Sequence, residues 1–116
     1  MLVHGAITPQ SLRPLLDVHV LTSRYRVVHY DRRGYDGGTP AATIADMAAD
    51  TALVAQQSAG GPVHVVGFSI GSIVDVQLAL QRPNLVNSLV LIEPTWLTRP
   101  EVIDLFEAAI APAVAA

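Results

Sequence analysis

The stretch Gly67-Phe68-Ser69-Ile70-Gly71 decides the fold, because it joins a strand-like run to a helix-like run. Before it, Val63-His64-Val65-Val66 is apolar and rich in β-branched residues, which predicts a buried strand. After it, apolar residues at helical spacing predict a helix over 70–80. Glycines on both sides of a serine suit a sharp strand-to-helix turn, because Gly67 and Gly71 carry no Cβ to collide across it. Such a turn exposes the hydroxyl at the edge of a sheet, so Ser69 is our candidate nucleophile.

The backbone amide of Ile70 is a candidate for binding negative charge at this turn. The first N–H groups of a helix point toward its N-terminus, where attack by Ser69 on a carbonyl would create an oxyanion. A simpler interpretation stays open, since serine is also a preferred helix cap and glycine an ordinary turn residue.

Strand-like and helix-like segments alternate outward from this turn. Further strands are predicted at 1–3, 26–30 and 88–92, the first of which reads as the end of a longer strand. Helical spacing also occurs over 12–19 and 44–55. Thr8-Pro9, Thr43, Gly60-Gly61-Pro62 and Arg82-Pro83 mark the element boundaries. This order predicts an α/β fold, a mostly parallel sheet of about four strands with three to four helices on both faces.

The composition is that of one globular domain. The chain has 116 residues, 51% of them hydrophobic and 15% charged, which suffices for one core but not for two domains. A net charge of −3 without basic runs gives no reason to expect nucleic-acid or membrane partners. No segment reaches the ~20 apolar residues of a membrane span and no leader is evident, so we expect a cytoplasmic protein. Cysteine is absent, which excludes thiolate zinc sites, and we expect neither metal nor cofactor.

Two further motifs occur in the order that one family requires. His4-Gly5-Ala6 follows the first predicted strand, and Asp31-Arg32-Arg33-Gly34-Tyr35-Asp36-Gly37-Gly38-Thr39 follows the second. With the serine motif, they resemble the N-terminal part of the α/β-hydrolase superfamily, serine-nucleophile type, over residues 1 to about 96. The resemblance implies that Ser69 is the nucleophile and that the backbone amides of Ala6 and Ile70 form the oxyanion hole. It also implies that His4 is structural and packs its loop.

The second motif departs from the family pattern at two positions. Asp36 stands where the family usually has glycine, and Thr39 where it usually has serine, so the local turn is expected to differ. Arg32, Arg33 and Asp31 are expected to fix this loop by hydrogen bonds, and direct contact with substrate is the alternative.

No histidine follows Ser69. A serine hydroxyl needs an imidazole within hydrogen-bond reach, and the order in this family is serine, acid, histidine. The histidines of the chain are His4, His19, His29 and His64. His64 is roughly 16 Å away along an extended strand, and we expect His19 and His29 to be neutral packing residues.

Glu93 is the candidate triad acid, because it ends the strand after the serine motif, where α/β sheets place their sites. Alternatively, it merely ends that strand in a Glu-Pro turn. Asp75 and Asp104 are predicted on helices away from the site, and Asp46 and Asp50 on one solvated helical face.

Residues 1–96 are therefore expected to form a partial α/β-hydrolase core and 97–116 to begin a truncated helical cap. Trp96 would line an acyl pocket or cover the core. The expected function is hydrolysis of an ester, thioester or related acyl substrate through Ser69, by a chain inactive or nearly so alone. A non-catalytic module that binds a ligand or a protein is the alternative. An exposed sheet edge beside the last strand would invite association.

Overall fold

A parallel sheet lies at the centre of the computed structural model, which describes residues 1–35, 37, 43–94, 100 and 104. The strands are β1 (Leu2–Val3), β2 (Val63–Phe68) and β3 (Val86–Ile92), in the order β1-β2-β3. The register pairs Val3 with Gly67 and Phe68 with Ile92. All three strands were predicted, and their parallel pairing confirms the α/β class.

The fourth predicted strand, at 26–30, is present only as an isolated bridge. His29 pairs with Leu2 in parallel, and the amide of Leu2 donates to the Val28 carbonyl at 2.8 Å. Because β1 has two residues, it offers little ladder to a neighbour on this side. The segment therefore lies beside β1, but the prediction of a full strand there was wrong.

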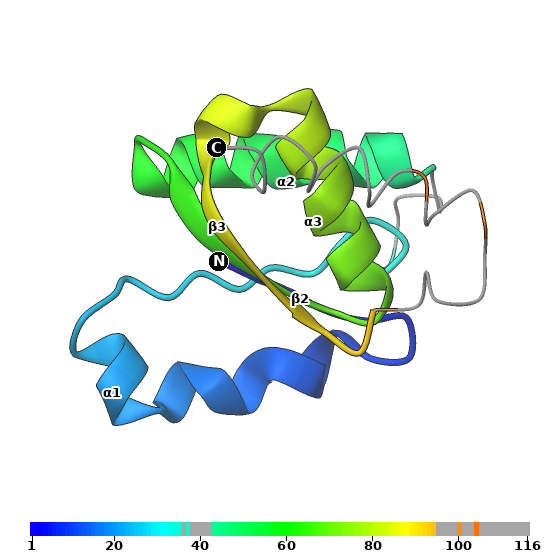
Figure 1. Cartoon of the computed structure of the whole chain (residues 1–116). Helices are drawn as coiled ribbons and strands as arrows, with labels where there is room; N and C mark the ends of the chain where they lie inside the picture. Colours follow the sequence, from blue (N-terminus) through cyan, green and yellow to red (C-terminus); the bar gives the residue numbers. More distant parts are fainter. Residues whose placement is uncertain (36, 38–42, 95–99, 101–103, 105–116) are drawn as a thin grey trace.

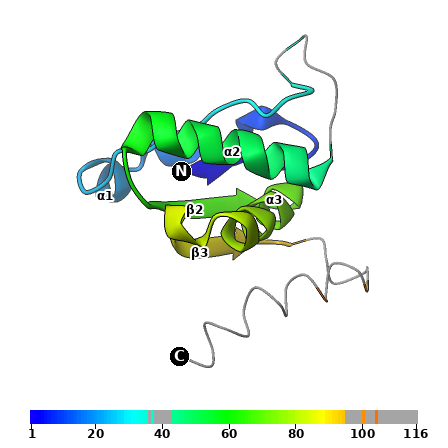
Figure 2. The ribbon, with the colours of Figure 1, turned by 90° about the horizontal axis from the view of Figure 1, so that it is seen from above.

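Helices cover both faces of the sheet (Figure 1). The helices α2 (Ile44–Ala59) and α3 (Ile70–Gln81) lie on one face, and η1 (Pro9–Asp17) and α1 (His19–Thr22) lie on the other. Figure 2 shows α2 and α3 side by side over the sheet, and a short 3₁₀ helix, η2 (Pro83–Leu85), leads from α3 into β3. This layered arrangement confirms the predicted architecture.

The segment predicted as one helix over 12–19 is divided. Residues Pro9–Asp17 form a 3₁₀ helix, and only His19–Thr22 is α-helical. Pro14 lies inside the first part. It has no amide N–H to donate, and in an α-helix its ring would clash with the carbonyl of the preceding turn. The prediction of helical structure was right, and its continuity was wrong.

The boundaries of α2 follow the predicted signals. Thr43 and Asp46 form a reciprocal capping box at its start, and Gly60 ends it with φ of 67°. Its buried face consists of small residues, Ala48, Thr51, Ala52 and Ala55. Such a face lets the helix lie close to the sheet and to α3.

The core lies between the sheet and these two helices. Val3, Val65, Val74 and Leu78 have no exposed surface, and they belong to one apolar cluster. The outer strand is less covered, since Val90 is 50% exposed. Within the described residues, β3 pairs with β2 alone, which leaves its other edge open.

Several predictions fall on residues outside this description. They concern Asp36, Thr39, Trp96 and, apart from Pro100 and Asp104, the cap segment 97–116. The division into core and cap therefore stays a prediction. None of the helices in the described ranges is long and apolar enough to cross a membrane.

Candidate active site

Ser69 lies at the sharp turn between β2 and α3, which we call the elbow. Its backbone has φ of 54° and ψ of −120°, outside the regions that L-residues usually adopt. Such a conformation costs on the order of 1–3 kcal/mol and persists only where its surroundings enforce it. Although Ser69 precedes the first residue of α3, its side chain makes no capping hydrogen bond. The structure therefore gives no support to the interpretation of Ser69 as a helix cap.

Hydrogen bonds hold both sides of the elbow. The amide of Ser69 donates to the Ile92 carbonyl at 2.9 Å, and the amide of Ser72 donates to the Ser69 carbonyl at 3.0 Å. The buried hydroxyl of Ser72 donates to the Gly67 carbonyl at 2.8 Å. These bonds join the ends of β2 and β3 to the first turn of α3.

The glycines of the elbow occupy positions that have no room for a side chain. A Cβ on Gly67 would lie 2.5 Å from Oδ2 of Asp75 and 2.7 Å from the Gly71 carbonyl oxygen. A Cβ on Gly71 would lie 2.2 Å from the Val3 carbonyl oxygen. Glycine is thus needed at Gly71 because of a tertiary contact, the close approach of α3 to the end of β1.

The loop His4–Ala6 follows β1 and lies against the elbow. A Cβ on Gly5 would lie 2.9 Å from the Phe68 ring and 3.3 Å from the Ser69 Cβ. Loop and elbow line an open cavity of about 390 Å³. Its lining residues are Gly5, Ala6, Ile7, Thr8, Ser11, Phe68, Ser69 and Glu93. Three predicted site residues, Ala6, Ser69 and Glu93, thus share one cavity.

Glu93 lies next to the elbow at the carboxyl end of β3. It directly follows Ile92, whose carbonyl accepts the Ser69 amide, and its own φ is 45°. The side chain is exposed at the mouth of the cavity. The strand end therefore places Glu93 in the lining of the cavity that contains Ser69.

His4 is completely buried, and both of its ring nitrogens are engaged. Nδ1 donates to the Gly5 carbonyl at 2.8 Å, and Nε2 accepts the Arg32 amide at 3.0 Å. This pattern requires the neutral ring with its proton on Nδ1. Burial lowers the pKa of His4, which favours the same form. A ring held in this way cannot accept a proton from Ser69, and His4 packs its loop as expected.

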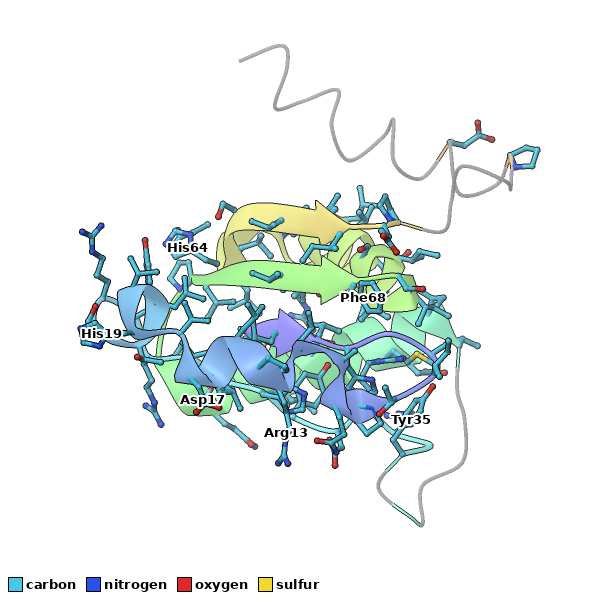
Figure 3. All side chains as sticks on the ribbon, turned by 90° about the horizontal axis from the view of Figure 1, so that it is seen from below. Arg13, Asp17, His19, Tyr35, His64 and Phe68 are labelled. Atoms are coloured by element: carbon cyan, nitrogen blue, oxygen red, sulfur yellow. The ribbon has the colours of Figure 1, made fainter. Side chains whose placement is uncertain are left out.

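The other histidines lie away from Ser69. Nε2 of the half-buried His29 is 2.8 Å from the Pro9 carbonyl oxygen, which fits the predicted packing role. Figure 3 shows His64 at the opposite end of β2 from Phe68, and its Nδ1 is 2.8 Å from the Ser88 hydroxyl. His19 was expected to pack but is exposed, because α1 begins at the surface. Over the described ranges, no histidine lines the cavity and no group of three acids or histidines could hold a metal.

The arginines of the loop after Tyr30 form hydrogen bonds mainly to other parts of the structure. Arg32 is 2% exposed and donates from Nε to the His4 carbonyl at 3.1 Å and from Nη2 to the Gly5 carbonyl at 2.9 Å. Arg33 forms a two-pronged ion pair with Asp50 on α2. The predicted hydrogen bonds of these arginines therefore exist, but they cross to the His4–Ala6 loop and to α2. Asp50 is paired in consequence, and the expectation of a purely solvated position was wrong.

The comparison with known proteins decides the family. A family model described as "alpha/beta hydrolase fold" matches residues 1–115. The chain belongs to the α/β-hydrolase family. The resemblance of its three motifs to the α/β-hydrolase superfamily is thereby confirmed.

Curated relatives of this α/β hydrolase carry one name. A "Putative carbamate hydrolase RutD" from Variovorax paradoxus (strain S110) is 42% identical over 78 residues, or 63% of this chain and 29% of that protein. A protein of the same name from Azorhizobium caulinodans is 34% identical over 106 residues, or 78% of this chain and 38% of that protein. The chain thus spans between 29% and 38% of the length of these two relatives.

A solved structure agrees with the α/β-hydrolase assignment. The crystal structure of the "Putative non-heme bromoperoxidase BpoC" from Mycobacterium tuberculosis H37Rv superposes with a TM-score of 0.73. The sequence identity is 26%, and the match covers 97% of this chain and 44% of that one.

Asp75 is a feature of this α/β hydrolase that the sequence analysis misplaced. It was predicted on a helix away from the elbow, yet its carboxyl is fully buried beside Gly67. Asp75 follows Gly71 by one helical turn, so both face the end of β1, and this spacing was the available signal. Neither carboxyl oxygen has a hydrogen-bond partner among the described residues, and burial raises the pKa of Asp75 well above its usual range.

Proposed function

We propose that Ser69 is the nucleophile of a serine hydrolase that acts on an ester, thioester or related acyl substrate. The proposal rests above all on the elbow, whose strained backbone at φ of 54° leaves the Ser69 hydroxyl without a capping role beside the cavity. Strain of this kind is concentrated at functional sites. Among acyl substrates, the name of the RutD relatives makes a carbamate the first to test.

The chemistry follows from the groups around the cavity. Oγ of Ser69 would form a bond to the carbonyl carbon and give its proton to a base, while the carbonyl oxygen takes up the negative charge. The N–H groups of Ala6 and Ile70 would donate to that oxygen. Collapse of the intermediate breaks the bond to the leaving group, which takes the proton, and water then hydrolyses the acyl-serine. Glu93 would orient and stabilise a protonated imidazole.

The base is the part of this mechanism that the sequence does not supply after Ser69. Because His4 uses both ring nitrogens in its loop, the 116-residue chain is expected to be inactive or nearly so. Free imidazole diffusing into the open cavity should restore part of the reaction, since it provides the missing proton acceptor.

The test is acetylation of the chain by p-nitrophenyl acetate, with and without imidazole, followed by mapping of the acetyl group by mass spectrometry. We expect an imidazole-dependent adduct on Ser69 that is lost in Ser69→Ala and kept in Ser88→Ala, a control at the far end of the sheet. The chain contains no lysine, so few other groups compete. Equal acetylation of Ser69→Ala and the unchanged chain would contradict the proposal.

A non-catalytic binding module is the second candidate, and the absence of histidine from the described lining of the cavity favours it. This module would bind a small acyl compound in the cavity without turning it over. Isothermal calorimetry with a carbamate, alongside the acetylation assay, distinguishes the two candidates. Binding without any adduct on Ser69 supports the module.

Two further proposals concern association and location. The open edge of β3 would support association between chains, which sedimentation velocity at increasing concentration tests directly. The cytoplasm is the proposed location, an expectation that rests on sequence alone.

A further inference from the structure

The carbonyl groups of the His4–Ala6 loop are all bound by side chains. The His4 carbonyl accepts from Nε of Arg32, and the Gly5 carbonyl accepts from Nη2 of Arg32 and from Nδ1 of His4. The Ala6 carbonyl accepts from the Tyr35 hydroxyl. Tyr35 and Phe68 lie at the same end of the sheet (Figure 3). Donors distant in sequence thus fix three consecutive peptide groups beside the elbow.

Fixing a carbonyl also fixes the amide on the other side of the same peptide bond. A trans peptide is planar, and its C=O and N–H point in opposite directions. The Gly5 carbonyl points toward Arg32 and His4, so the Ala6 N–H must point away from them. Gly5 and Ala6 both line the cavity that contains Ser69, so an Ala6 N–H directed away from Arg32 and His4 can point into that cavity.

We propose that Arg32 is a positioning residue that directs the Ala6 N–H into the Ser69 cavity. This inference rests on the proposed function, in which that N–H stabilises the oxyanion. Arg32 acts through the peptide and does not touch the substrate itself.

The burial of Arg32 strengthens this role. Arg32 is 2% exposed, and over the described residues its guanidinium forms no ion pair with a carboxylate. Among the described residues, its partners are the two carbonyls, the Met47 sulfur at 3.1 Å and the face of the Tyr35 ring at 5.3 Å. A buried cation bonded to the Gly5 carbonyl polarises that peptide and makes its N–H a stronger donor.

The chain offers a matched pair of variants. Arg32→Lys keeps the charge but loses the planar fork that reaches two carbonyls at once. Tyr35→Phe removes the bond to the Ala6 carbonyl, which belongs to the next peptide and controls the Ile7 N–H. The two changes should therefore affect neighbouring amides separately.

The direct readout is the orientation of single amides, measured as ¹⁵N–¹H residual dipolar couplings on the full chain. In the unchanged protein, we expect the Ala6 coupling to match an N–H directed into the cavity. Arg32→Lys should change that coupling and speed exchange of the Ala6 amide about tenfold, whereas Tyr35→Phe should change Ile7 and leave Ala6. An Ala6 N–H that points elsewhere in the unchanged protein overturns the inference, whether or not Arg32→Lys folds.

The imidazole-dependent acetylation of Ser69 gives the functional readout. We expect Arg32→Lys to slow it about tenfold, less than the ~10²–10³ lost with an oxyanion donor itself, and Tyr35→Phe to change it less than twofold. Equal rates in Arg32→Lys and the unchanged protein would refute the role of Arg32. If the unchanged protein forms no adduct on Ser69, the proposed function fails, while the amide couplings still decide the orientation.

Discussion

The backbone at Gly71 lies so close to the end of β1 that a Cβ on it would be 2.2 Å from the Val3 carbonyl oxygen. This contact joins the first turn of α3 to the strand from which the His4–Ala6 loop departs. The absence of a Cβ at Gly71 therefore determines how the elbow lies relative to the loop. It also determines the shape of the cavity between them.

Gly71→Ala is accordingly expected to destabilise the protein strongly. Neither partner can yield, because both are backbone, so we expect a loss of at least about 3 kcal/mol, the upper end for overpacking. The measurement is the free energy of unfolding in urea. Gly61→Ala is the control, since a Cβ there meets nothing within 4 Å and its φ is not positive. The control should leave stability unchanged or raise it by up to about 1 kcal/mol, and similar losses in both variants would contradict the explanation.

Asp75 should make stability depend on pH in an unusual direction. Burial raises the pKa of Asp75 in the folded protein above the usual 3.8, so the folded state keeps a proton that the unfolded state loses. Stability is then complete below the unfolded pKa and falls as pH rises toward the folded pKa, by about 1.4 kcal/mol per pH unit in between. Asp75→Asn, which cannot ionise, should remove this slope from urea unfolding measured between pH 4 and 8.

Asp46 provides a control, because its effect on the change of stability with pH is opposite to that of Asp75. Hydrogen bonds from Thr43 lower the pKa of Asp46, so its contribution is present above the unfolded pKa and lost as pH falls. Asp46→Asn should keep the slope that Asp75 causes. If Asp75→Asn and the unchanged protein lose stability equally with rising pH, the buried carboxyl is not the source.

The features that could be predicted from the sequence are those that depend on neighbouring residues in the chain. The elbow at Ser69, the strands on either side of α3 and the cap at Thr43 all follow from residue type and spacing. The interruption by Pro14 was equally local, and its effect on η1 could have been predicted from the missing amide.

The misplaced features depend on contacts between distant segments. Arg32 follows the segment 26–30 in sequence, but its fork binds the carbonyls of His4 and Gly5 after β1, and no spacing rule indicates that partner. Asp75 carries a charge that usually signals a surface, yet α3 is buried on nearly all sides between the sheet and α2. His19 has helical spacing, but only the packed structure shows that α1 begins at the surface.

The hydroxyl of Ser72 should contribute to holding the elbow. It is fully buried and lies 2.8 Å from the Gly67 carbonyl oxygen and 3.3 Å from that of Ile92, so it joins β2 to β3. We expect Ser72→Ala to cost about 1 kcal/mol in urea unfolding, the typical net value of one hydrogen bond. The exposed Ser88→Ala should cost less than about 0.5 kcal/mol. Equal costs would mean that the buried hydroxyl is not needed.

Glu93 can be tested as the acid through the imidazole-dependent reaction of Ser69. Glu93 is exposed and lines the cavity, so its carboxylate would stabilise the imidazolium that forms when imidazole takes the proton of Ser69. Glu93→Gln keeps the size but removes the charge, and we expect it to slow acetylation about tenfold, within the range of general acid–base effects. Asp31→Asn serves as the control, because Asp31 is exposed and is not among the residues that line the cavity. Rates that stay equal in Glu93→Gln and Asp31→Asn would remove Glu93 from the mechanism and leave it as the residue that ends β3.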